Sequence, residues 1–262
     1  MPDIRSLTLA DRSLVMEYLH RYPPEISEHT FTNLFIWQPS RPVFFAEINN
    51  SLVFLLKSAN DDKEYILCGP PIGKIIIPDI LSAFDTCASS ISVIGAIRIP
   101  DKNTENLPPA EYVVTEDRDN ADYIYLVSDL AELRGRNFSK KRNKIKQCLN
   151  NHLCEYVPIT SELIAECEIM QENWCQTRDC GRNPGLCNEA NAIAETFAHF
   201  DDFGLLGGAI RVDGRIQAYA IAEELHPGTA VGILKRQWQM YLVLASLLTS
   251  GFPDMDFLVL TM

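Results

Sequence analysis

One order of elements occurs twice along this chain, and it constrains the fold more than any other feature of the sequence. In each half, two segments with helical spacing of apolar residues precede two β-rich runs joined by a two-residue turn. The turn pairs are Asn49-Asn50 and Asp213-Gly214, which are both typical of β-hairpins. We therefore expect two copies of one α+β unit, although the two halves show no visible sequence identity.

The first copy is expected to form a mostly antiparallel sheet flanked by helices. Its helical segments are residues 10–20, 31–38 and a stretch after Pro78, which suits a first helical turn. Its β-rich runs are residues 42–48, 51–58, 64–68, 94–100, 111–117 and 122–128. We place this first domain at residues 1–127.

The second copy is expected at residues 128–231 and to be incomplete as written. A helix that continues from the basic residues near 140 leads into a strand at 153–159. Two further helices follow, one starting at Thr160-Ser161-Glu162 with good capping chemistry and one at 188–200. The hairpin around Asp213-Gly214 completes the repeat.

Composition excludes several classes of protein. The chain has 262 residues, of which 47% are hydrophobic and 22% charged, so it is neither disordered nor collagenous. No apolar run reaches the roughly 18 to 20 residues that a membrane helix needs, and the N-terminus lacks the apolar region of a signal peptide. Eight cysteines are too few for a disulfide scaffold of this length. We expect a reduced, cytoplasmic protein.

Charge is distributed unevenly. The net charge of −12 argues against a general binder of nucleic acids or anionic membranes. Residues 134–146, however, read RGRNFSKKRNKIK and contain seven bases and no acid. We call residues 134–146 the basic segment. It is the most informative electrostatic feature of the sequence.

Several motifs, in their order and spacing, resemble a known bacterial family. They are FTNLFIWQ, LCGPPIG, EDRDNADYIY, GRNFSKKRN followed by a helix, and GLLGGAIRVDGRIQAYAIAEEL, and they extend from about residue 5 to residue 231. The sequence resembles the family named for the C-terminal domain of phosphatidylglycerol lysyltransferase. The resemblance implies two tandem acyl-CoA N-acyltransferase-like domains. It also implies acyl or aminoacyl transfer, because characterised relatives move an amino acid from aminoacyl-tRNA to a lipid headgroup or a peptide amine.

The matching motif gives a candidate site for a phosphate group of tRNA, a lipid or a nucleotide. Such a cluster binds phosphate through charge-assisted hydrogen bonds. The candidate residues are Arg136, Lys140, Lys141, Arg142, Asn143 and Lys144. Four alternatives remain open at this point: a transferase, in contact with phospholipid headgroups or not; a non-catalytic nucleotide- or RNA-binding module; a defective remnant without activity; and a solvated helix face with no ligand.

Catalytic and pocket residues are less clearly indicated. Glu223, near the end of a strand that faces the expected cleft, is a weak candidate for a general base. Trp174 is either a core residue or a wall of the substrate pocket. The cysteines between 167 and 187 lack a zinc knuckle, so we expect no metal site.

Acyl-CoA is not expected as a cofactor. Ordinary acetyltransferases hold its pyrophosphate with a glycine-rich loop, roughly R/Q-x-x-G-x-G/A, at the N-terminus of a helix. Neither half contains a match. Gly207-Gly208 lies within an expected strand instead, where paired glycines mark a bulge or close packing.

The tail at residues 232–262 departs abruptly from the family pattern. Permitted codons for Gly232 onward, read from the third base, give HFEKAMANVPG, which matches the strand and helix with which the family continues. We therefore expect this tail to be a frameshift product. We also expect it to leave the hairpin at 204–224 with an unpaired edge, because its apolar residues lack the alternation of a replacement strand.

Overall fold

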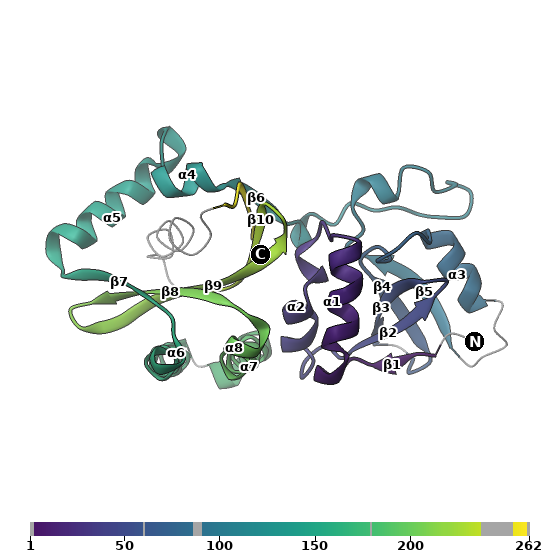
Figure 1. Ribbon diagram of the computed structural model, residues 1–262, viewed down its shortest axis with the longest axis horizontal. Helices are drawn as coiled ribbons and strands as arrows, with labels where there is room; N and C mark the ends of the chain where they lie inside the picture. The colour runs from purple at the N-terminus through teal and green to yellow at the C-terminus, as the bar shows by residue number, and fades with distance from the viewer. Residues whose placement is uncertain (1–2, 60, 86–90, 179, 237–253, 261–262) are drawn as a thin grey trace. The chain divides into compact units, whose positions relative to one another are not determined.

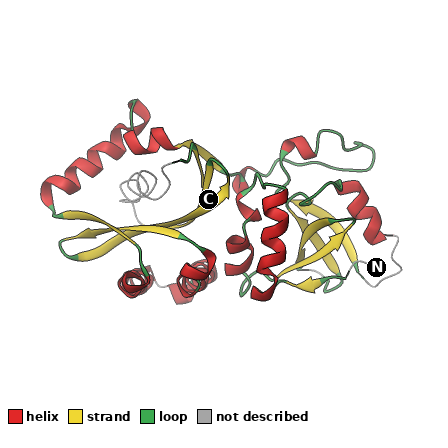
Figure 2. Ribbon diagram, viewed as in Figure 1, coloured by secondary structure: helices red, strands yellow, loops and turns green. Residues whose placement is uncertain are grey.

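The computed structural model describes residues 3–59, 61–85, 91–178, 180–236 and 254–260. The chain divides into two compact units, residues 1–122 and 123–261 (Figure 1). Each unit contains one sheet with helices on both faces, which confirms the expected α+β class (Figure 2). The division falls a few residues before the domain boundary expected at residue 127.

The first unit is built on a five-stranded sheet in the order β1-β2-β3-β4-β5. Helices α1 and α2 cover one face and α3 covers the other (Figure 1). The strands are β1 (Arg5–Ser6), β2 (Val43–Ile48), β3 (Ser51–Lys57), β4 (Glu64–Cys68) and β5 (Ser92–Ile97), and the helices are α1 (Arg12–Arg21), α2 (Phe31–Ile36) and α3 (Ile77–Asp85).

The first hairpin forms where the turn pair predicts it. Asn49 and Asn50 have φ values of 49° and 58°, the left-handed conformation that two-residue hairpin turns require and that asparagine tolerates. The pairing register places Phe45 opposite Phe54, and both side chains are buried. The turn therefore fixes the register that fills the core.

The end of the first unit differs from the expectation. Residues 111–117 form no strand, and Val113 is 94% exposed. Strand β6 (Tyr123–Leu126) forms but pairs with β11 (Phe257–Leu260) in the second sheet. The expectation that both runs complete the first sheet is wrong, because β-propensity indicates a fit to a sheet without naming the partner strand.

The second unit contains a six-stranded sheet in the order β6-β11-β10-β9-β8-β7. Helices α4 and α5 lie over one face, and α6, α7 and α8 lie over the other (Figure 1). The remaining strands are β7 (Cys154–Pro158), β8 (Leu206–Val212), β9 (Arg215–His226) and β10 (Thr229–Arg236), and the helices are α4 (Val127–Glu132), α5 (Ser139–Asn151), α6 (Ser161–Arg178), α7 (Pro184–Ala198) and α8 (Phe200–Phe203).

The strand order of the first sheet recurs in the second. Strands β7 to β11 are adjacent in the same succession as β1 to β5. The last pair of each series, β4 with β5 and β10 with β11, is parallel, and the other pairs in each series are antiparallel. The expectation of two copies of one unit is confirmed at the level of topology.

Alternation along β9 defines the two faces of the second sheet. Ala218, Ala220 and Ala222 lie in the core cluster that Leu130 of α4 joins. Tyr219 points to the other face, where its hydroxyl donates to Gln171 of α6 over 3.0 Å. Small residues on the first face let the helical layer pack closely against the sheet.

The glycine pair in β8 marks close packing, as the sequence predicts. A Cβ on Gly207 would lie 2.8 Å from Ile159, and one on Gly208 would lie 2.5 Å from the ring of Tyr156. Both contacts are shorter than a side chain tolerates, so glycine is required at these two positions by neighbours in β7 and just after it.

The tail contributes a strand, which corrects the expectation of an unpaired edge. Strand β9 pairs with β8 and β10, and β11 pairs with β10 and β6. Leu258 and Leu260 of β11 are buried in the core. A strand that is paired on both edges and covered on both faces is a continuous apolar run and shows no alternation. The lack of alternation in the tail therefore does not exclude a strand there. The run Tyr241–Leu248, considered as a short helix, lies outside the described residues.

Candidate functional site

The basic segment begins in a tight turn between α4 and α5. Helix α4 ends at Leu133 in the left-handed conformation, with φ of 50°, and Gly135 has φ of 85° and ψ of 175°. Only glycine adopts the second conformation without strain. The 3-10 turn Arg136–Phe138 then leads directly into α5.

Arg142 holds this turn in place. Its Nη1 donates to the carbonyl oxygen of Gly135 over 2.8 Å and also to that of Leu133. These carbonyls belong to the end of α4, where backbone acceptors lack partners within the helix. Arg142, a predicted phosphate ligand, therefore has a structural role in this unit.

Helical spacing divides the other bases of the segment between several faces. Lys141, Ile145 and Cys148 form the inward face of α5, and the Lys141 ammonium lies 5.1 Å from the centre of the Phe138 ring. Lys140 and Lys144 are exposed and one turn apart. Arg136, which is also exposed, lies four residues before Lys140. We call Arg136, Lys140 and Lys144 the basic column.

The electrostatics of the basic column favour an anion. The first turn of α5 contains three bases, Lys140, Lys141 and Arg142, and no acid. The positive end of a helix dipole normally attracts acids and repels such bases. Positive side chains at a helix N-terminus are the chemistry that binds phosphate. Asn143 lies next to this column and is exposed.

Glu223 does not share a surface with the basic column. It alternates with Ala222 on β9, so it lies on the face of Tyr219, which α6 and α7 cover. Helices α4 and α5 lie over the opposite face (Figure 1). The structure therefore separates the predicted general base from the predicted phosphate ligands.

Trp174 lines a cavity of about 470 Å³ between α6 and the turn of the β8–β9 hairpin. Its neighbours in the lining include Ile169, Met170 and Ile216, and the Arg178 guanidinium lies 5.9 Å from the indole ring centre. This apolar cavity lies on the same sheet face as Glu223 and on the opposite face from the basic column. The pocket role of Trp174 stays a prediction.

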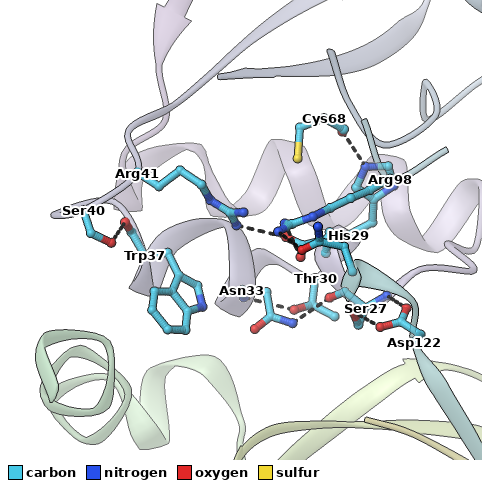
Figure 3. Close-up of polar contacts among 12 residues, drawn as sticks. Ser27, His29, Thr30, Asn33, Trp37, Ser40, Arg41, Cys68, Arg98 and Asp122 are labelled. Carbon is cyan, nitrogen blue, oxygen red and sulfur yellow. Dashed lines mark hydrogen bonds and ion pairs between the residues drawn. The ribbon is translucent and has the colours of Figure 1, made fainter. Parts of the chain in front are cut away.

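Sequence reasoning missed a buried ion-pair cluster in the first unit. The carboxylate of Glu28 accepts from Arg41 over 2.9 Å and also pairs with Arg98, and these side chains are only 15% to 29% exposed. Figure 3 shows both guanidinium groups converging beside His29. Arg98 has φ of 57°, a strained value for a residue other than glycine. Close to this cluster, Thr30 caps α2 by accepting from the Asn33 amide over 3.1 Å. This cap can be predicted from the sequence, whereas the ion pairs cannot.

This cluster borders a cavity of about 1400 Å³ in the same unit. Glu28, Arg98 and Asp122 contribute to its lining, and Asp122 accepts hydrogen bonds from Ser27 Oγ over 2.7 Å and from the Ser27 amide over 3.0 Å. Glu28 is thus paired with two guanidinium groups and Asp122 is bonded to Ser27, and these interactions support the fold around the cavity.

The loop between β4 and α3 is built differently from a pyrophosphate-binding loop. Ser51 Oγ accepts from the amides of Lys74 and Ile75, over 3.1 and 3.2 Å. A Cβ on Gly69 would lie 2.2 Å from the His29 ring. Two amides of this loop are thus engaged within the protein.

Metal-ligating side chains do not gather in the part of the chain that the structure describes. No group of three or more His, Cys, Asp or Glu residues there is placed to hold a metal ion. Cys167, Cys175 and Cys187 are free thiols. The expectation of a metal-free protein stays a prediction. Among the described residues, no helix is long and apolar enough to cross a membrane.

The fold thus contains two units of the same strand order, and the second one presents the basic column. The family model described as "Phosphatidylglycerol lysyltransferase, C-terminal" matches residues 19–239. The chain belongs to this family, as the motifs indicate. A search of curated proteins finds no significant match.

Solved structures agree with this assignment. A conserved protein of unknown function from Bacteroides thetaiotaomicron is 25% identical with a TM-score of 0.87, over 100% of this chain and 90% of that chain. The L-PGS structure from Bacillus licheniformis is 12% identical with a TM-score of 0.61, over 96% and 78%. The C-terminal DUF2156 domain of a protein described as a lysylphosphatidylglycerol synthetase from Agrobacterium fabrum is 12% identical with a TM-score of 0.59, over 97% and 78%. The latter two show the fold alone.

Proposed function

We propose that this protein is an acyl- or aminoacyltransferase that takes its acyl group from aminoacyl-tRNA or a similar activated ester. The acceptor is an amine or a lipid headgroup. The family name refers to the transfer of lysine to phosphatidylglycerol, and the proposal extends that class of reaction to this chain. The reaction takes place in the cytoplasm, with the protein contacting phospholipid headgroups peripherally.

The observation that carries the proposal is the basic column on α5. Arg136, Lys140 and Lys144 follow one another at four-residue intervals on the exposed side of this helix and its leading turn. A tRNA donor and a phospholipid acceptor both contain phosphate, and Arg and Lys bind phosphate through charge-assisted hydrogen bonds. The column holds phosphate of the tRNA donor.

The chemistry asks little of side chains beyond positioning. The acceptor attacks the activated ester carbonyl, and the ester oxygen leaves with the donor's carrier. Holding both reactants in register and stabilising the developing oxyanion account for most of the acceleration in such reactions. A basic column that binds a phosphate of one reactant contributes to holding the two reactants in register.

A second function, a non-catalytic RNA- or nucleotide-binding module, is favoured by one observation. Glu223, the single candidate for a general base, lies on the sheet face opposite α5. A phosphate-binding surface that is separated from this candidate base is compatible with such a module. The two functions share the ligand chemistry and differ in turnover.

Incubation of the full chain with tRNA carrying a radiolabelled amino acid separates the two functions. The acceptors are phosphatidylglycerol vesicles, neutral phosphatidylcholine vesicles and a soluble amine, each in its own reaction. The transferase predicts label on a lipid or on the amine. Binding of tRNA without transfer supports the module and overturns the transferase, and absence of both overturns both.

Matched variants tie the activity to the basic column. Lys140→Ala with Lys144→Ala removes two exposed charges from α5, and Lys63→Ala with Lys74→Ala removes two exposed charges from the first unit. The first double variant is expected to raise the KM for charged tRNA at least tenfold, which is about 1.4 kcal/mol. The second leaves KM unchanged. Equal effects of the two pairs would show that the column has no specific role.

A further inference from the structure

Two cysteines meet where α5 ends and β7 begins. Cys148 lies in the last turns of α5 and is buried, and Cys154 is the first residue of β7. Their Sγ atoms are 3.1 Å apart. Five residues separate the two thiols in the chain, so the turn between helix and strand brings them into contact.

A hydrogen-bonded frame holds this turn in place. Asp213, in the β8–β9 turn, accepts from His152 Nδ1 over 2.7 Å and from the Leu153 amide over 3.0 Å. Cys154 is paired with Val212 in the β7–β8 ladder. The chain on both sides of the cysteine pair is thus anchored to the same hairpin, and this anchoring keeps the two sulfurs together.

The pair is reached through a cavity of about 710 Å³. Cys148 contributes to its lining, together with Gln147, His152, Asp213 and Arg215. Lys144 lies one turn before Cys148 on α5. The cavity lining is polar, and it contains both a base, Arg215, and an acid, Asp213.

We propose that Cys148 and Cys154 form a reversible dithiol–disulfide pair that reacts with a low-molecular-weight disulfide of the glutathione class. The Cys148 thiolate attacks one sulfur of the small disulfide, which breaks the S–S bond, releases one small thiolate and leaves a mixed disulfide on Cys148. The Cys154 sulfur then attacks Cys148 Sγ and displaces the second small thiolate. The two protein thiols are oxidised, the small disulfide is reduced to two thiols, and the protons of Cys148 and Cys154 pass to them.

The surroundings of the two sulfurs set the order of these steps. Burial, together with the neighbouring thiol of Cys148, raises the pKa of Cys154 to about 11. A thiol with such a pKa is rarely ionised at neutral pH, and the thiolate is the nucleophile. Cys148, which lines the cavity, reacts first, and Cys154 resolves the mixed disulfide because it is already in contact with Cys148.

The test uses the reduced full chain exposed to oxidised glutathione, followed by alkylation of remaining thiols and mass measurement under non-reducing conditions. The wild type is expected to lose two alkylatable thiols without a retained glutathione adduct, and fragmentation maps the bond to Cys148 and Cys154. Cys154→Ser is expected to retain one glutathione on Cys148. Cys148→Ser is expected to retain none on Cys154. Cys187→Ser removes an exposed thiol and leaves the pair unaffected.

Two outcomes would overturn the proposal: a stable glutathione adduct on Cys148 of the wild type, or bonds distributed among all the cysteines. The same reaction in concentrated urea shows what an unfolded chain does, and there the pairing is expected to become unselective. Thermal unfolding of each reduced variant identifies any that fails to fold. For such a variant, Cys→Ala at the same position replaces Cys→Ser.

Discussion

Arg142 illustrates how the basic segment combines structure and binding at the scale of single residues. Its guanidinium donates to the carbonyls of Leu133 and Gly135, so it closes the turn that precedes α5. Arg142→Ala is expected to cost roughly 1 to 2 kcal/mol of unfolding free energy, because hydrogen bonds to charged groups are lost. Urea unfolding measures this cost.

Lys146→Ala, an exposed change on the same helix, is the control and is expected to change stability by less than about 0.5 kcal/mol. Equal effects would contradict the structural role of Arg142.

His29 predicts a pH dependence of stability. Burial lowers the pKa of His29 from its ordinary value of 6.5 to about 4, and its Nε2 donates to the Cys68 carbonyl over 3.0 Å. The unfolded chain takes up a proton below about pH 6.5 while the folded chain does not, so stability falls as the pH drops toward 4. The expected loss is about 3 kcal/mol over this window.

Denaturant unfolding between pH 4.5 and 7 measures this slope. In His29→Gln, the slope of the unfolding free energy against pH is expected to lose the contribution of His29. This holds even where the variant is less stable at every pH. His20→Gln, on the exposed side of α1, keeps the full slope. A slope that survives in the His29 variant would show that the buried imidazole is not its source.

At the scale of elements, local signals predicted hairpins well and strand partners poorly. Asp213 and Gly214 have φ values of 48° and 84°, and a turn of this kind fixes its two strands by itself. Residues 123–126 show the limit, because the run predicts a strand but its partner is β11, more than a hundred residues away. Residues 111–117 have strand-forming composition and form no strand. Pairing across such distances depends on the whole fold.

The tail strand gives a direct prediction. Leu258 is fully buried between β10 and β6, while Phe257 beside it is 42% exposed. Leu258→Ala in the full chain is expected to cost about 2 to 5 kcal/mol, and Phe257→Ala clearly less. Urea unfolding of both variants compares them. Equal, small losses would mean that β11 does not belong to the core.

The origin of the tail is a separate question from its fold. The family match reaches residue 239, eight residues into the tail. We propose that residues 232–262 are read from a shifted frame, because an alternative reading from Gly232 gives HFEKAMANVPG, which resembles the continuation of the family pattern. A shifted frame can still supply a short apolar strand such as β11. Restoring the frame from codon 232 is expected to raise the unfolding free energy by several kcal/mol, at roughly 1.5 to 3 kcal/mol per additional buried large side chain. Resequencing the coding DNA and unfolding both chains test this. No gain in stability would contradict the proposal.

At the scale of the whole molecule, the sequence predicted the two-unit fold and the chemistry of the candidate site, but not its geometry. The basic segment can be recognised in the sequence because a run of bases is apparent without knowledge of the fold. Its division into an inward Lys141, a structural Arg142 and the basic column depends on which face of α5 meets the sheet. The sequence names Glu223 and Trp174 as candidates without placing them relative to this segment. Alternation along β9 places Glu223 on the other sheet face, and Trp174 lies on α6, which covers that face.

The central claim is that the basic column binds the phosphate groups of a nucleic-acid donor, and the salt dependence of tRNA binding tests it most directly. The logarithm of the affinity falls linearly with the logarithm of the salt concentration, and the slope counts the phosphates that the protein neutralises. Lys140→Ala with Lys144→Ala is expected to reduce that slope by roughly two, about one for each lysine. Lys63→Ala with Lys74→Ala leaves it unchanged. A slope that is the same in the wild type and in both double variants would contradict the account.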